Sequence, residues 1–169
     1  LREMAREVMV WCQPELVPLV SGVPGVDRAL PLHEGAPGLD FDVDIEIMEI
    51  PYAIRATRDQ VTMRSPYLKC SPSPVPQAMR RGEALSIGLV WQTSDWDTRR
   101  SFPLSELRKL RLPGTQLYSL QRGEAAKAVA EIGAIDISVP DLQTLAGRLR
   151  ALDLVICPDT MVAHLSAAL

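Results

Sequence analysis

The second half of the chain alternates between short apolar runs and segments with helical patterning, and this alternation narrows the possible folds most. Apolar runs predict strands at 85–92, 115–120, 135–139 and 154–157. The segments between them predict helices at 103–110, 123–132 and 141–152, and another from Thr160 onward. Strands and helices that alternate with short connections form βαβ units around a parallel sheet. The sequence therefore predicts an α/β fold for residues 82–169.

Residues 1–64 predict a second and less regular α/β region. Short apolar runs indicate strands around 8–11 and 28–32, and a helix is expected to start near Pro14. From 40 to 47 acidic and apolar residues alternate with a period of two, which is typical of a strand with one wet face. The stretch from 52 to 62 predicts loop with some helix.

Proline concentrates between the two regions. Four prolines fall in the eleven residues from Pro66 to Pro76. Proline at this density interrupts helices and ladders and favours stiff, extended chain. We therefore expect three parts: a partial α/β domain at 1–64, an interdomain linker at 65–81 and a partial α/β domain at 82–169.

Composition excludes several classes of function. The net charge of −3 gives no basic footprint for nucleic acid, and no apolar run approaches the roughly 18–20 residues of a membrane span. With two histidines in 169 residues, a histidine-based metal cluster is not expected. Cys12, Cys70 and Cys157 are odd in number and far apart, which favours free thiols in a reducing, cytoplasmic location.

The turn after the last predicted strand is the strongest candidate for a binding site. Ligands of open parallel sheets bind beyond the carboxyl ends of the strands. Asp159 or Thr160 can cap the helix that follows, and the first N–H groups of that helix can hold a phosphate. His164 lies four residues after Thr160 and shares its helix face. A plain N-cap followed by a half-buried histidine explains the same residues without a ligand.

Two more turns at the same predicted edge carry candidate ligand groups. Arg99 and Arg100 follow the first strand and can clamp a diphosphate, although a solvated pair of loop charges fits equally well. Arg122 adds a third cation after the next strand. Gln121 can hydrogen-bond a base or a sugar there, or cap the following helix.

Other features carry weaker signals. Asp42 and Asp44 form an Asp-x-Asp pair of the kind that holds a divalent cation, but they belong to a longer alternation that a solvated strand explains without metal. Trp91 is expected in the core, whereas Trp96 lies in a loop where it can stack on a base. The chain has neither of the glycine-rich phosphate-binding motifs of dinucleotide-binding and P-loop proteins.

Four segments, taken in order, carry a resemblance to a known family. The segments IGLVWQ, RRSFPLSEL, YSLQRGEA and LDLVICPDTMVAHLSAAL resemble the donor-binding half of the bacterial heptosyltransferase-like (family 9-type) glycosyltransferases. The resemblance is closest to the form fused behind tetratricopeptide repeats. VWCQPELVPLV, PGVDRALPL and FDVDIEIMEIP are similar to the late part of the acceptor-side domain of the same family.

The resemblance implies a GT-B-like fold, with two Rossmann-like parallel-sheet domains that are both incomplete here. It implies a nucleotide-diphosphate sugar as donor substrate, with no metal and no other cofactor. Asp159, Thr160 and His164 would then lie at the donor diphosphate and sugar, Arg100 would supply a cation for phosphate, and Gln121 would lie beside the nucleotide. The acceptor hydroxyl would belong to a glycan, a lipid-linked sugar or a protein.

The same resemblance implies that the chain is an internal fragment. The carboxylate base of the family is expected before Leu1, and a further strand is expected after Leu169, so we expect this chain to be inactive by itself. Sheet edges left exposed in this way favour pairing between chains. Two alternatives stay open: a non-catalytic nucleotide- or partner-binding α/β module, and a metal-dependent transferase that uses Asp42 and Asp44.

Overall fold

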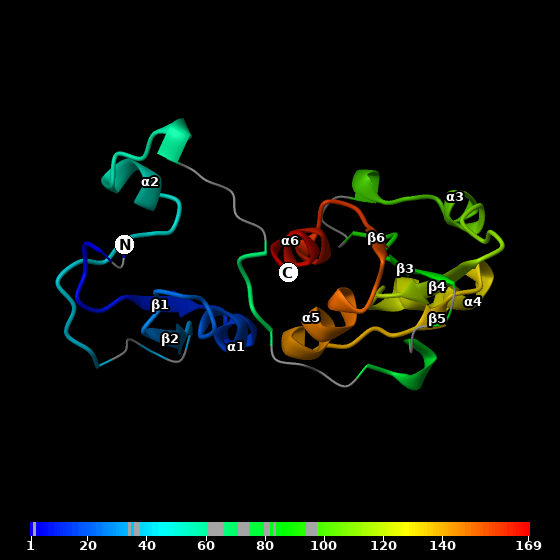
Figure 1. Cartoon of the computed structure of the whole chain (residues 1–169), viewed down its shortest axis with the longest axis horizontal. Helices are drawn as coiled ribbons and strands as arrows, with labels where there is room; N and C mark the ends of the chain where they lie inside the picture. The colour runs from blue at the N-terminus through cyan, green and yellow to red at the C-terminus, as the bar shows by residue number, and fades with distance from the viewer. Residues whose placement is uncertain are drawn as a thin grey trace.

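The protein has two parallel β-sheets with helices packed on them, as the computed structural model shows (Figure 1). The structure describes residues 1, 3–33, 35, 38–60, 66–70, 75–79, 82, 84–93 and 98–169. A two-stranded sheet lies in the first region and a four-stranded sheet in the second. The prediction of an α/β fold with parallel sheets is confirmed. Within the described residues, no helix has the length and apolar character to cross a membrane.

The four-stranded sheet contains β3 (Leu85–Leu89), β4 (Thr115–Ser119), β5 (Ile135–Asp136) and β6 (Leu154–Ile156). All neighbouring strands are parallel, and their order is β5-β4-β3-β6. This is the order of the first four strands of a doubly wound sheet, in which the chain reverses direction between the first and fourth strands. The reversal falls here between β3 and β6, so the crevice that such a sheet offers to ligands lies at the carboxyl ends of these two strands.

Helices cover both faces of this sheet. Because side chains alternate along a strand, Ile87, Leu89 and Trp91 point to one face and Val90 to the other. The first face packs against α3 (Leu104–Arg108) and α4 (Val129–Ile132), and the second against α5 (Leu142–Arg150) and α6 (Met161–Ala168). Trp91 is buried, which confirms its expected place in the core.

Every element predicted after residue 82 is present, but most are shorter than predicted. The helix expected at 123–132 begins as a 3₁₀ helix at Glu124–Ala128, and only then continues as α4. Pro103 is the N-cap residue of α3 instead of its first helical residue. The Ser101 hydroxyl does not cap that helix; it accepts a hydrogen bond from the Thr93 N–H at 3.1 Å.

The first region has one short βαβ unit. Strands β1 (Met9–Cys12) and β2 (Arg28–Pro31) pair in parallel, and α1 (Val17–Val20) lies between them in sequence after a 3₁₀ helix at Pro14–Leu16. Helix α1 contacts both β2 and α5. Its Leu19 is only 2% exposed and belongs to the same core cluster as Leu145 and Leu165 of the second region. Leu19 therefore anchors the first region to the second.

The strand predicted at 40–47 is wrong. These residues run without strand structure, and most of their side chains are exposed. A period-two pattern needs a neighbouring strand before it becomes a sheet, and the described residues supply none beside this segment. The helical content expected at 52–62 corresponds to α2 (Ile50–Ala53) and a 3₁₀ helix at Arg58–Gln60, while residues 61 and 62 lie outside the described residues.

The described parts of the proline-rich segment lie against the second region. The N–H groups of Tyr67 and Leu68 both donate to the Ala168 carbonyl at the end of α6, at 3.0 and 2.9 Å. Cys70 and Met79 are buried in the core that α5 and α6 share. The described parts of this segment are therefore packed on the second region, and Gln77–Met79 form a 3₁₀ helix. The three cysteines are all free thiols.

Candidate functional site

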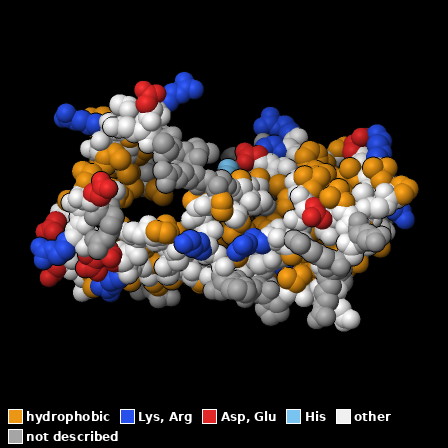
Figure 2. Space-filling view, viewed as in Figure 1, with side chains coloured by type: hydrophobic (Ala, Val, Ile, Leu, Met, Phe, Trp, Pro, Cys, Tyr) orange, Lys and Arg blue, Asp and Glu red, His pale blue; other side chains and the backbone are white. Residues whose placement is uncertain are grey.

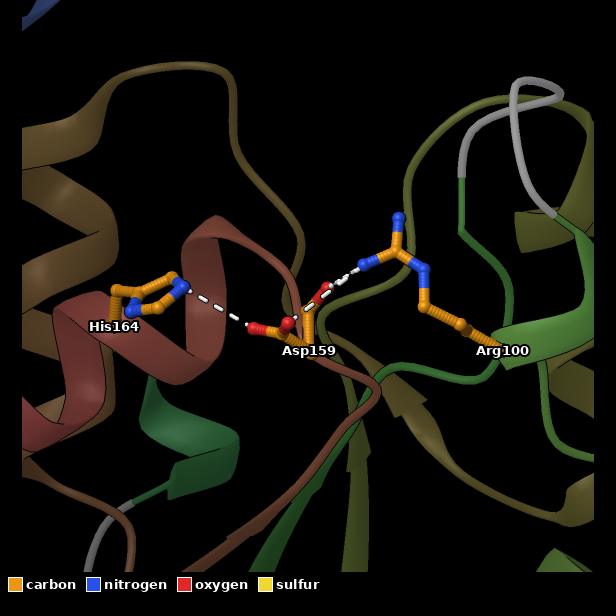
Figure 3. A network of polar contacts seen from close by, with 3 residues as sticks. All are labelled: Arg100, Asp159 and His164. Atoms are coloured by element: carbon orange, nitrogen blue, oxygen red, sulfur yellow. Dashed lines mark hydrogen bonds and ion pairs between the residues drawn. The ribbon is translucent and has the colours of Figure 1, made fainter.

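Three of the predicted site residues meet where β3 and β6 end (Figure 3). Arg100 lies in a 3₁₀ helix at Thr98–Arg100 after β3, Asp159 lies in the turn after β6, and His164 lies in α6. The Arg100 Nη1 donates to the Asp159 carbonyl oxygen at 2.7 Å and lies 3.8 Å from Asp159 Oδ2. His164 Nε2 lies 3.1 Å from Asp159 Oδ1. Asp159 thus links the arginine to the histidine.

The strand order explains this convergence. Arg100 and Asp159 are 59 residues apart in sequence, but β3 and β6 are direct neighbours in the sheet, so their exits share one edge. The loop after β3 is fixed to the end of its strand because the Phe102 N–H donates to the Trp91 carbonyl at 2.7 Å. This hydrogen bond closes the loop and places Arg100 next to the turn that follows β6.

The Gln121 side chain hydrogen-bonds the backbone just after β3 and β4. It is buried after β4, and its Oε1 accepts from the N–H groups of Trp91 and Gln92 at 3.0 and 2.9 Å. Its Nε2 donates to the carbonyls of Gln92 and Arg122 at 3.3 and 3.0 Å. The side-chain amide therefore holds the chain that leaves β3 against β4. The sequence predicted the right turn for Gln121 but not this role, because a buried amide is satisfied by whichever backbone groups surround it.

Thr160 is the N-cap residue of α6, but its hydroxyl makes no capping hydrogen bond. Its backbone is extended, with φ −141° and ψ 175°, and its Oγ1 is buried with no hydrogen-bond partner among the residues that the structure describes. The first N–H groups of a helix have no intrahelical acceptor. The prediction that Asp159 or Thr160 caps this helix by its side chain is not met, since the Asp159 carboxylate instead contacts Arg100 and His164.

His164 and Asp159 are open to solvent. Their side chains are 78% and 72% exposed, so the alternative of a half-buried histidine is wrong. Exposure also means that water and salt screen this ion pair, which therefore contributes little to folding stability. The pair is available to a ligand instead of being committed to the core.

The remaining candidates are exposed side chains or lie outside the described residues. Arg99 is exposed in the same turn as Arg100, and Arg122 is exposed after β4. Asp42 and Asp44 are exposed in the first region, and the described residues contain no cluster of three or more histidine, cysteine, aspartate or glutamate side chains suited to a metal. Trp96 lies outside the described residues.

The Cys157 thiol, two residues before Asp159, has a raised pKa. Burial raises the pKa of the Cys157 thiol, and the negative charge of Asp159 raises it further. The thiol therefore stays neutral at physiological pH and is a poor nucleophile. The charged groups of the site are Arg100, Asp159 and, when protonated, His164. A guanidinium and a helix N-terminus attract anions, and a carboxylate accepts hydrogen bonds from hydroxyls.

Comparison with models of known protein families, with curated proteins and with solved structures gave no match to this chain.

Proposed function

We propose that this chain contributes the donor-binding part of a GT-B-like glycosyltransferase, which transfers a sugar from a nucleotide diphosphate to an acceptor hydroxyl without a metal ion. The observation that carries the proposal is the convergence of Arg100, Asp159 and His164 at the point where the strand order reverses. Doubly wound sheets bind nucleotides at this position. The segments that form the site are those that resemble the family.

The proposed division of labour follows from the chemistry of each group. Arg100 and the first N–H groups of α6 hold the diphosphate, and the buried Thr160 hydroxyl is a further donor at the same turn. Asp159 accepts hydrogen bonds from sugar hydroxyls. His164 lies at the same turn, with its Nε2 3.1 Å from Asp159 Oδ1 in the free protein.

Positive charge at this turn serves transfer as well as binding. When the sugar–phosphate bond breaks, negative charge grows on the departing diphosphate, and Arg100 with the helix N–H groups stabilises that charge. The acceptor hydroxyl attacks the anomeric carbon and loses its proton to a general base. The proposal assigns no residue of this chain to that base and is limited to the donor-binding step.

Nucleotide binding without metal tests the proposal. We expect ADP or UDP, with a chelator present, to raise the melting temperature; a ligand at one hundred times its Kd stabilises by about 2.7 kcal/mol. Arg100→Ala removes a charge-assisted hydrogen bond donor and should weaken binding about 10- to 100-fold. His164→Ala should weaken it less, because the histidine side chain is 78% exposed.

Lys109→Ala is the matched control. Lys109 is an exposed cation at the far end of α3, where it pairs with Glu106, so its loss changes the net charge equally without touching the turn. If both variants lost the same nucleotide affinity, the effect of Arg100→Ala would be one of net charge and not of contact with the phosphates. No shift with any nucleotide would refute donor binding and favour a partner-binding module. A shift that requires manganese and disappears in Asp42→Asn would favour the metal-dependent alternative.

A further inference from the structure

Among the described residues, no helix lines the cavity on one face of the two-stranded sheet in the first region. Met9 and Trp11 of β1 point to the same face as Leu30 of β2, because Trp11 pairs with Leu30 in the register. These three residues line a cavity of about 560 Å³. Helix α1 packs on β2, but none of its residues lines this cavity. Parallel sheets are normally covered on both faces, so this face lacks its usual cover.

The other wall of the cavity is the segment at 39–44, which has no regular secondary structure and in which acidic and apolar residues alternate. Phe41 and Val43 alternate with Asp40, Asp42 and Asp44. Together with Glu7 and Arg6, this gives the cavity four carboxylates and one guanidinium. The wall therefore combines apolar surface with an excess of negative charge.

The same character continues along the chain beyond the cavity. Met48 is 83% and Tyr52 89% exposed, and Ile47 is also exposed. Figure 2 shows hydrophobic side chains gathered below α2, at the edge of an opening in the molecule. Five acidic residues and no lysine or arginine occur between residues 38 and 54. Exposed apolar side chains that cluster in this way mark interaction surfaces.

We propose that this acidic groove, formed by β1, β2 and residues 39–54, binds an amphipathic helix of a partner protein whose apolar face is flanked by lysine or arginine. A helix is the element that usually covers a parallel sheet, and an apolar groove is the usual receptor for an amphipathic helix. The flanking charge follows from complementarity with Asp40, Asp42 and Asp44. The groove is separate from the Arg100 site, and its occupancy does not depend on the proposed donor.

A pair of synthetic peptides tests the proposal on the whole chain. Each peptide has about 18 residues, long enough to form a helix, with leucines on one face. The flanking residues are lysines in one peptide and glutamates in the other. We expect the lysine peptide to bind at least about tenfold more tightly by fluorescence anisotropy, because the glutamate peptide meets like charges. Its binding should shift the emission of Trp11, and the shift should be lost in Trp11→Phe.

Charge variants in the groove distinguish charge complementarity from nonspecific hydrophobic binding. Asp42→Asn with Asp44→Asn should weaken the lysine peptide about fivefold, the scale of two exposed charge contacts. Glu106→Gln with Glu124→Gln makes the same charge change on the second region and should leave affinity unchanged. Equal binding of both peptides, or equal effects of the two double variants, would overturn the proposal. A dimer in sedimentation that the Asp42 and Asp44 changes dissociate would assign the groove to a second copy and overturn it as well.

Discussion

The two regions of this protein use similar βαβ units but differ in how they bury apolar surface. In the second region, both faces of the sheet carry packed cores, with Leu89 and Ile132 fully buried on one face and Leu165 on the other. Among the described residues from 1 to 60, only Leu19 is a buried hydrophobic residue, and it packs into the core of the second region. The second region therefore contains most of the buried core, to which Leu19, Cys70 and Met79 are added from outside it, whereas the first region has no buried cluster of its own among the described residues.

The first region shows that correct secondary structure can form without a hydrophobic core of its own. Strands β1 and β2 form with correct parallel pairing, but two strands and one short helix enclose too little apolar surface for a core of their own. The large apolar residues of the first region remain on its surface, and this is why the acidic groove is available. A sheet of four strands with helices on both faces has no such shortage.

The largest expected effect comes from the core of the second region. Leu89→Ala removes a fully buried side chain and leaves a cavity, so we expect the free energy of unfolding to fall by about 2–5 kcal/mol in denaturant titrations. Met48→Ala in the first region should change it by less than about 0.5 kcal/mol, because that side chain is exposed. Similar losses in both variants would contradict the contrast between the regions.

Leu19→Ala tests the anchor between the regions. It should lower the free energy of unfolding by about 2–3 kcal/mol, because the side chain is lost from a packed cluster. Limited proteolysis should then cut first within residues 1–60, since local opening follows the loss of buried contacts. Val43→Ala is the control, because its side chain is exposed in the same region. Unchanged proteolysis in Leu19→Ala would show that the first region holds together without this anchor.

The smallest expected effect concerns the side-chain cap of α5, which α3, α4 and α6 of the same region lack. Asp141 caps α5 by accepting from the Thr144 N–H at 2.7 Å, whereas α1 and α2 have no side-chain cap. Asp141→Ala should cost about 1 kcal/mol at pH 7 in urea titrations. Asp44→Ala, in the first region, should be close to neutral.

This cap also gives a pH dependence with a definite sign. Hydrogen bonds from the Thr144 side chain and backbone lower the pKa of Asp141, because they favour the charged carboxylate. The stabilisation is therefore complete above the ordinary aspartate pKa of about 3.9, and it is lost as the pH falls through the lowered value. The difference between the wild type and Asp141→Ala should shrink over that acidic range. A difference that stays constant with pH would show that the carboxylate charge is not what stabilises the helix.

The sequence predicted the second region well because its strand and helix patterns alternate regularly and are separated by turn residues. The end of each element was less predictable: residues that look like strand, such as Val90 and Trp91, continue past the last ladder pair of β3. The strand expected at 40–47 failed for a related reason. Its pattern was that of a half-buried strand, but a strand also needs a partner, and the pattern holds no information about one.

For the candidate site, the sequence determined which turns carry polar and charged groups, and the parallel α/β pattern placed those turns at one edge. Arg100, Asp159 and His164 were found in this way. Only the tertiary structure decided that β6 pairs with β3, which brings Arg100 to Asp159 across 59 residues, and that the Gln121 amide is used by the backbone beneath them. The physical reason is that apolar patterning fixes which faces are buried, whereas strand order and the partners of each polar group arise from packing between segments far apart in the chain.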